Sequence, residues 1–284
     1  MGARLLRHNL LFPLQDKTRI NNRLDAVTFF YKNSTIRKEL RNLLDQVYDL
    51  ERLNSRMILG SGNGRDMLSM KSSFSSLPAI FSLLAQCNTQ KLIDIREQFD
   101  TLADLHQLLE QAIHHEAPVT LHDGHLIKSG FNEELDELVL LLRDGKKLIL
   151  ELEAKERAAT GIGKLKIGFN KVFGHFIEVS KLQALGAQDR RVELEYKLFL
   201  AIRVQLAENS SRLLKTAQLL AQVDFLAANS EMAHRFNYRR PEINDGDEII
   251  ILEGRHPVIE RTLPSGKFVP NDVHLDQTSD EVLI

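Results

Sequence analysis

The chain has 284 residues, of which 43% are hydrophobic and 27% are charged, so it is long and apolar enough to bury a core. Its formal net charge of −2, from 37 basic and 39 acidic residues, excludes a globally basic DNA-coating protein but leaves room for a local basic patch. The single cysteine, Cys87, excludes an internal disulfide and a cysteine metal cluster, which favours a reducing compartment.

Residues 1–130 have the periodicity of a helical bundle. Apolar residues recur at steps of three and four between Ile36 and Leu53, and the same spacing returns in residues 77–84 and 92–109. Residues 121–127, which read LHDGHLI, place a glycine before two apolar residues and predict a short hairpin. The first 130 residues are therefore predicted to form a helical core.

Residues 132–159 predict one further helix. Asn132 suits the N-cap position, and Glu133 and Glu134 in the first turn favour the helix dipole. Leucines at helical spacing keep one face of this segment apolar.

The pattern then changes from a period of 3.6 to a period of 2. Residues 165–169 and 175–179 alternate apolar and other side chains, with glycines around them, and predict a strand pair. The helical period returns at 190–237, which contains no glycine or proline and would form a helix roughly 70 Å long. Helix, strand pair and helix in this order predict an antiparallel arm with a small β tip.

Residues 238–284 differ in pattern from the helical part. After Pro241, residues 248–252 form a strand-like run that ends at a turn around Gly254, so we expect a domain boundary near residue 238. The first residues lack the pattern of a signal peptide, and the final EVLI resembles a strand without its continuation. We therefore expect a partial chain.

Residues 164–180, which read KLKIGFNKVFGHFIEVS, resemble the clamp motif of the MutS family of DNA mismatch-repair proteins. Flanking segments agree with this resemblance. Those similar to the core domain of the family are residues 14–27, 47–53 and 63–66. Those similar to the start of its ATPase domain are residues 237–241, 253–258 and 268–272. The order of the segments matches the family over nearly the whole chain.

The resemblance implies a mainly α fold with five parts. These are a helical core at 1–130, an ascending lever helix at 131–160, a clamp at 161–189, a descending lever helix at 190–237, and the first strands of a C-terminal α/β ATPase domain at 238–284. Two departures from the family are visible in the sequence. The clamp lacks a further stretch that includes a basic strand, and no Gly-x-x-x-x-Gly-Lys-Ser/Thr loop occurs.

The resemblance places contacts with the DNA backbone on the clamp. The candidate residues are Lys164, Lys166, Asn170, Lys171, His175 and Lys181. Lys164 and Lys166 would share one face of a strand, and lysines bind phosphates without reading sequence. Composition alone favours a simpler interpretation, in which these lysines keep a small sheet soluble.

The resemblance also places Phe268 against the adenine of a bound nucleotide, with the backbone of Val269 nearby. A flat aromatic face suits a purine. Without the resemblance, Phe268 is better explained as a core residue under a loop. Because the phosphate loop is absent from the sequence, we expect neither enzyme activity nor a cofactor in this segment. ATP and Mg²⁺ belong to the complete proteins of the family.

Two further groups of polar residues have simple explanations. The five clustered histidines are His106, His114, His115, His122 and His125. A zinc site needs three or four convergent ligands, and no His-Glu-x-x-His pattern occurs, so we expect solvent-facing histidines rather than a metal site. Asp49 and Arg52 are neighbours on a helix and predict a surface ion pair rather than acid–base chemistry.

We therefore expect a core, lever and partial clamp segment that binds the DNA backbone without sequence preference and couples an ATPase domain to the clamp. The alternative is a helical coiled-coil scaffold or adaptor that does not bind DNA. The expected partners are double-stranded DNA and the rest of the MutS chain, with a homodimer in the full-length protein. No apolar run reaches the ~18 residues of a membrane span, and a cytoplasmic, nucleoid-associated location is expected.

Overall fold

The computed structural model describes residues 2–122, 124–143, 175–264 and 266–276, and side chains between 175 and 187 lie outside this description. The chain divides into two compact units, Met1–Pro13 with Asn22–Arg239 and Leu14–Asn21 with Arg240–Ile284. The described residues are mainly helical, which confirms the predicted fold class. Within these ranges, no helix is both long and apolar enough to cross a membrane.

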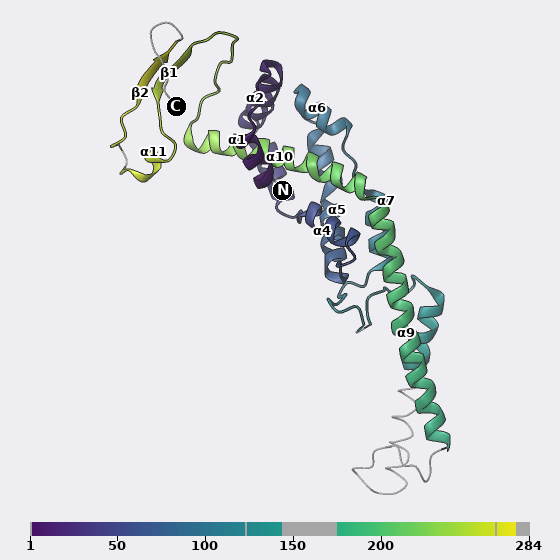
Figure 1. Cartoon of the computed structure of the whole chain (residues 1–284). Helices are drawn as coiled ribbons and strands as arrows, with labels where there is room; N and C mark the ends of the chain where they lie inside the picture. Colours follow the sequence, from purple (N-terminus) through teal and green to yellow (C-terminus); the bar gives the residue numbers. More distant parts are fainter. Residues whose placement is uncertain (1, 123, 144–174, 265, 277–284) are drawn as a thin grey trace. The chain divides into compact units, whose positions relative to one another are not determined.

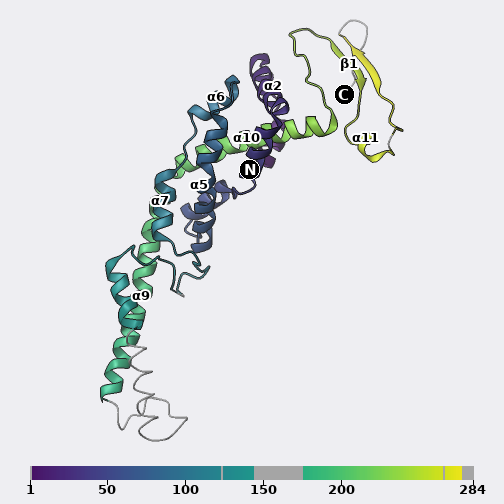
Figure 2. The same ribbon diagram turned by 180° about the vertical axis from the view of Figure 1, so that it is seen from behind.

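Helices build the first unit (Figures 1 and 2), although residues 17–21 at the start of α2 belong to the second unit. They are α1 (Gly2–Leu11), α2 (Lys17–Lys32), α3 (Ser34–Leu44), α4 (Leu50–Ile58), α5 (Gly64–Leu84), α6 (Gln90–Glu97), α7 (Ala103–Ala112), α9 (His175–Glu208) and α10 (Ser210–Phe236). Residues 133–143 are also helical and run beside α9 in both views. α10 packs against α1, α3 and α4, whereas α9 packs against α4 and α7.

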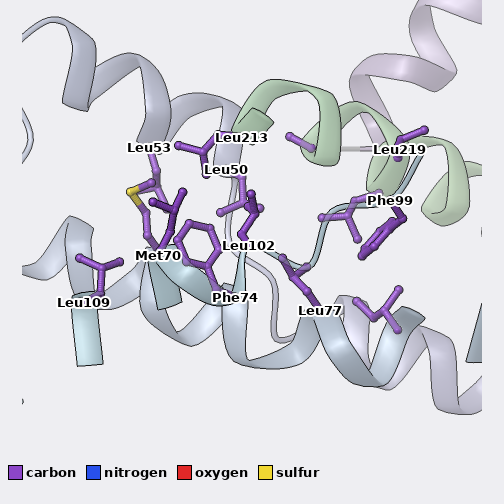
Figure 3. Packing of buried hydrophobic residues seen from close by; sticks show 14 of the residues in the cluster. Leu50, Leu53, Met70, Phe74, Leu77, Phe99, Leu102, Leu109, Leu213 and Leu219 are labelled. Atoms are coloured by element: carbon purple, nitrogen blue, oxygen red, sulfur yellow. The ribbon is translucent and has the colours of Figure 1, made fainter. Parts of the chain in front are cut away.

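The helix α5 lies at the centre of the core, where it contacts α3, α4, α6 and α7. Its first turn is closed by a capping box. Asn63 Oδ1 accepts from the Asp66 N–H at 3.0 Å, and Asp66 Oδ2 accepts from the Asn63 N–H at 2.9 Å. Phe74 of α5 is 1% exposed and belongs to the buried cluster drawn in Figure 3, together with Leu50 and Leu102. Burying side chains of this size stabilises the fold by roughly 1.5–3 kcal/mol each.

The prediction of one continuous helix over 190–237 is wrong. The segment forms two helices, α9 and α10, which end and begin on either side of Asn209 and meet at an angle in Figure 1. The apolar period is the same for one helix or two, so periodicity could not locate the break. Residues of the core contact the segment around Asn209, as described below. These contacts hold α9 and α10 at an angle to each other.

Two predicted strand features are also corrected. Residues 175–179, expected as the second clamp strand, are helical and form the start of α9. They continue the helical segment that follows them, and a two-stranded hairpin is marginal without further strands. Residues 121 and 122 form a turn, and the described residues among 124–127 contain no strand pair of their own; Ile127 instead makes an isolated antiparallel bridge with Ile113. The first predicted clamp strand, 165–169, lies outside the described residues.

The second unit contains a two-stranded antiparallel sheet, which confirms the strand predicted at 248–252 (Figure 1). β1 (Ile249–Gly254) pairs with β2 (Asn271–Leu275), and the short helix α11 (Ile259–Thr262) lies between them in sequence. The register shifts between Ile251 and Gly254. A Cβ on Gly254 would lie 2.9 Å from the Asn271 carbonyl oxygen, so the close approach of the strands there requires glycine.

Candidate functional site at the joint of the long helices

The joint between α9 and α10 is formed by a single residue, Asn209, with φ −91° and ψ 12°. Its N–H is shared between the carbonyl oxygens of Gln205 at 3.3 Å and Leu206 at 3.2 Å. Its side-chain Nδ2 donates back to the Gln205 carbonyl oxygen at 2.9 Å. Asn209 therefore completes the last turn of α9 and makes no side-chain cap for α10.

Arg212, in the first turn of α10, connects the joint to the segment that leads into α7. Its Nε donates to Asp100 Oδ2 at 2.8 Å, and its Nη1 and Nη2 donate to the two carboxylate oxygens of Asp104 at 2.8 and 2.9 Å. Nη1 also donates to Asn209 Oδ1 at 2.9 Å. The hydrogen bonds from Arg212 lower the pKa of Asp104 and outweigh the opposing effect of burial. The paired hydrogen bonds fix the orientation of the Arg212 guanidinium relative to the Asp104 carboxylate, as well as the distance between them.

The side of the joint that faces α4 is held by Asn54. This residue is 1% exposed, and its Nδ2 donates to Ser210 Oγ at 3.2 Å. Its Oδ1 is buried and has no hydrogen-bond partner. Because α4 packs against both α9 and α10, Asn54 lies where the two helices diverge. The joint is thus held by α4 and by the residues at the start of α7.

A second attachment joins α9 to the loop that precedes residues 133–143. Glu195 of α9 is 2% exposed; its Oε2 accepts from the Leu126 N–H at 2.9 Å and its Oε1 accepts from Arg191 Nε at 2.9 Å. Gly124 in this loop has φ +76°, and a Cβ there would overlap Arg191 Nη2. The positive φ favours glycine at this position, and any larger residue would require the Arg191 guanidinium to move.

A third attachment joins α10 to α3 through a buried arginine. Arg37 is 1% exposed; its Nε donates to Glu231 Oε2 at 2.9 Å and its Nη1 donates to the Phe30 carbonyl oxygen at 2.8 Å. Arg41 adds a second ion pair to Glu231 at 3.3 Å. Burial raises the pKa of Glu231, but the two arginines lower it by more, so the net pKa is below its ordinary value.

The predicted DNA-contacting residues fall in the part of the chain whose side chains are not described. Lys164, Lys166, Asn170 and Lys171 lie outside the described residues entirely. His175 and Lys181 are on the helical backbone of α9, and their side chains lie outside the description.

The predicted nucleotide contacts fall on the second unit, in the loop between α11 and β2. Phe268 is partly buried there, so it is neither a fully buried core residue nor a fully exposed aromatic face. Val269 is 72% exposed.

The prediction of an Asp49–Arg52 ion pair is wrong, because the partner of Asp49 is Arg4. Arg4 Nη1 and Nη2 donate to the two carboxylate oxygens of Asp49 at 2.7 and 2.8 Å, and Arg4 also pairs with Glu51. Asp49 is the N-cap of α4, and it accepts from the backbone N–H of Arg52 at 3.1 Å rather than from its side chain.

Three of the five histidines lie close together. The ring centroid of His114 is 4.3 Å from that of His115 and 6.2 Å from that of His125. Burial and the two neighbouring imidazoles lower the pKa of His114. His122 lies 5.1 Å from the ring of Tyr196, and His106 is on α7. Across the described ranges, no group of histidine, cysteine, aspartate or glutamate side chains has the geometry of a metal site.

Sequence reasoning missed the residues that attach the long helices to the core. A signal for the joint was present, because Asn209, Ser210 and Ser211 are three consecutive residues that favour helix caps over helix interiors. A signal for the buried arginine was also present, since Arg37 is three residues before Leu40 on the same helix face. The long-range partners Asp100, Asp104 and Glu231 had no local signal.

The comparisons with known proteins agree with the resemblance. Residues 1–230 match the family model described as MutS domain III. The protein named DNA mismatch repair protein MutS from Desulforamulus reducens is 42% identical over 97% of this chain, which corresponds to 35% of that protein. Its namesakes from Acetivibrio thermocellus and Ruminiclostridium cellulolyticum are 41% and 40% identical over 100% of this chain, or 36% of each protein.

The chain thus spans about a third of the length of these relatives. The alignment with the Acetivibrio thermocellus protein covers 315 positions against 284 residues here, so at least 31 of its positions have no residue in this chain. The family model covers the Arg212 and Glu195 attachments and ends one residue before Glu231, whereas the alignment with the Acetivibrio thermocellus protein covers all three. The chain belongs to the MutS family and carries its domain III.

Proposed function

We propose that this chain is the core and lever segment of a DNA mismatch-recognition ATPase. In this proposal, the segment couples the ATPase domain to a clamp that grips the DNA backbone. The observation that carries it is the attachment of α9 and α10 to the core by three buried or forked polar contacts, centred on Arg212, Glu195 and Arg37. Helices held in this way move as rigid elements, so displacement at one end is passed to the other.

The sequence at the two ends of the helix pair supports the direction of coupling. α9 follows directly on the clamp-like residues 164–174, and α10 leads to residues 237–241, which resemble the start of the ATPase domain. The relatives are named for DNA mismatch repair, which supports DNA as the partner of the whole protein. The alternative, a scaffold without DNA binding, leaves the clamp-like segment unexplained.

The DNA contact in this proposal is made by Lys164, Lys166, Asn170, Lys171, His175 and Lys181. Engaging two to four phosphates would give a slope of log K against log salt of roughly −2 to −4, and an affinity of about 10⁻⁴ M or weaker at physiological salt. With only about a third of the length of its relatives, this segment is expected to bind matched and mismatched duplexes equally.

Fluorescence anisotropy with matched and mismatched duplexes tests this contact. Replacing Lys164 and Lys166 together by alanine should weaken both complexes equally and flatten the salt dependence. The matched control replaces Lys197 and Lys215, two exposed lysines of α9 and α10, and should leave binding unchanged. Preference for the mismatched duplex, or equal losses in the test and control variants, would count against the assignment.

ATP and Mg²⁺ are proposed to bind the complete protein rather than this segment alone. Phe268 and Val269 would supply only the adenine contact, and stacking of a base on an aromatic ring contributes about 1–3 kcal/mol. We expect no ATP turnover by the purified 284-residue chain and only very weak nucleotide binding. Turnover that is abolished by a substitution within this chain would show that a catalytic site has been missed. The homodimer is likewise proposed for the full-length protein.

A further inference from the structure

The joint at Asn209 is a place where local sequence and structure disagree. Residues 190–237 contain no glycine or proline, and their apolar period continues unbroken through the joint, so composition and periodicity favour one straight helix even though Asn209, Ser210 and Ser211 favour caps. The structure instead ends α9 at Glu208 and begins α10 at Ser210. Such conflicts between local preference and tertiary structure are found preferentially at functional sites.

The bend is held from outside the two helices. Arg212 is fixed by Asp100, which precedes α7, and by Asp104 in the first turn of α7, and Thr216 Oγ1 donates to the Asp100 carbonyl oxygen at 3.2 Å. On the α4 side, Asn54 bonds to Ser210. A sharp helix kink has an identifiable cause, and these contacts from α4 and the start of α7 lie at the bend.

The bent arrangement also carries costs that a straight helix would avoid. Asn54 Oδ1 is buried without a partner, and the N–H of Asn209 is shared between two long hydrogen bonds. α10 begins without a side-chain cap, whereas a continuous helix would bond the N–H groups of its first turn to carbonyls of the preceding turn. The ion pairs of Arg212 offset these costs in the bent state. Weakening these ion pairs should therefore shift the equilibrium toward the straight helix.

We propose that the joint has two states, bent and straight, and that the contact of Arg212 with Asp100 and Asp104 stabilises the bent state. Below, this two-state joint is called the elbow and this contact is called the latch. When the latch opens, Asn209 adopts helical dihedral angles and α9 swings toward the axis of α10, carrying with it the loop bound by Glu195. The role of this movement, a change in the direction of the lever relative to the core, rests on the proposed function. The two states themselves are proposed from the contacts at the joint and do not rest on the proposed function.

Distance measurements between two spin labels test the elbow on the whole 284-residue chain. Ala201→Cys on α9 and Ala228→Cys on α10 place labels at exposed positions on either side of the joint. The native Cys87 can remain, because it is 4% exposed and burial raises the pKa of its thiol to about 11. A continuous helix would separate positions 201 and 228 by about 40 Å, and the bent state is shorter.

The unmodified joint should give one short distance. Arg212→Met should add a second population that is longer by at least one helical turn, about 5 Å. Lys215→Met removes an exposed cation of the same helix and should leave the short distance unchanged. Exchanging the charges, with Arg212→Asp and Asp104→Arg together, should restore the short population that Arg212→Asp alone has lost.

A second arm of the experiment uses no substitution in the latch. The Arg212 and Asp104 side chains are 40% and 59% exposed, so salt screens their attraction. Raising salt from about 0.1 to 1 M shortens the Debye length from about 10 to 3 Å and should increase the long-distance population. If both the salt series and a helical, folded Arg212→Met chain keep only the short distance, the elbow is wrong. No DNA or nucleotide is present, so this result is independent of the proposed function.

Discussion

At the scale of single residues, Arg37 is the side chain whose loss should be most damaging. It is 1% exposed and pairs with Glu231, which is 30% exposed. Arg37→Ala leaves that carboxylate with Arg41 as its ion-pair partner and also removes the donor to the Phe30 carbonyl oxygen. Removing one member of a buried pair costs about 3–5 kcal/mol, and the partial exposure of Glu231 favours a loss of about 3 kcal/mol.

Urea denaturation can measure this loss against a matched control. Arg41 pairs with the same carboxylate but is 47% exposed, so Arg41→Ala should reduce the free energy of unfolding by less than about 1 kcal/mol. Equal losses for the two variants would mean that burial of Arg37 is irrelevant to its contribution.

The ion pair between Arg4 and Asp49 should make stability depend on pH in acid. The hydrogen bond from Arg4 lowers the pKa of Asp49 from 3.8 to about 2, against the effect of burial. A carboxyl with a lowered folded-state pKa stabilises the fold above its unfolded value, and this contribution disappears as pH falls through the folded value. The stabilisation should therefore be complete above about pH 5 and should decline toward pH 2.

Asp49→Asn isolates this contribution, because asparagine keeps the N-cap while removing the charge. The variant should have a lower urea midpoint than the parent near neutral pH, and the two midpoints should converge as the pH falls below about 4. A difference that stays constant down to the lowest pH at which the chain is folded would contradict the assigned role of Arg4.

At the scale of elements, the attachment of α9 through Glu195 makes a prediction about glycine. Gly124→Ala introduces a side chain at φ +76° that would overlap Arg191 Nη2, so it should disturb the Arg191–Glu195 pair. Gly130→Ala has φ +88° with nothing within 4 Å of its Cβ, so it should cost only the backbone strain of about 1–2 kcal/mol. Gly124→Ala should cost about 1–3 kcal/mol more, for the disturbed buried carboxylate.

Thermal or urea unfolding of the two alanine variants gives this comparison directly. Equal losses at Gly124 and Gly130 would show that the loop is held by backbone conformation alone, without the contact to Arg191.

The elements themselves were predictable where periodicity and composition decide them. The helical core and the strand after Pro241 follow from apolar spacing that is local in sequence. The break at Asn209 was not predictable in this way, because it depends on Arg212 meeting Asp100 and Asp104, more than a hundred residues earlier. The helical start of α9 at His175 was missed for a different reason: an alternation of only five residues is too short to separate a strand from the first turns of the helix that continues after it.

At the scale of the whole molecule, the resemblance supplied what physical reasoning on the residues could not. The clamp-like and core-like segments identified the family, which the family model over residues 1–230 and the relatives then showed. The resemblance did not predict the residues that attach the long helices to the core. A motif gives the residues that occur in one segment, but it does not give the distant residues that they contact. The proposed DNA-contacting lysines lie in the part of the chain outside the structural description.

The central claim is that the long helices transmit nucleotide state to the grip on DNA. The most direct measurement is the DNA affinity of the full-length protein containing this segment, with and without ATP, for the parent and the Arg212→Met variant. The parent and the Lys215→Met control should show a change in Kd when ATP is added. Arg212→Met should keep ATP turnover and nucleotide-free DNA binding while losing most of that change. An undiminished response to ATP in a folded Arg212→Met protein would contradict coupling through this joint.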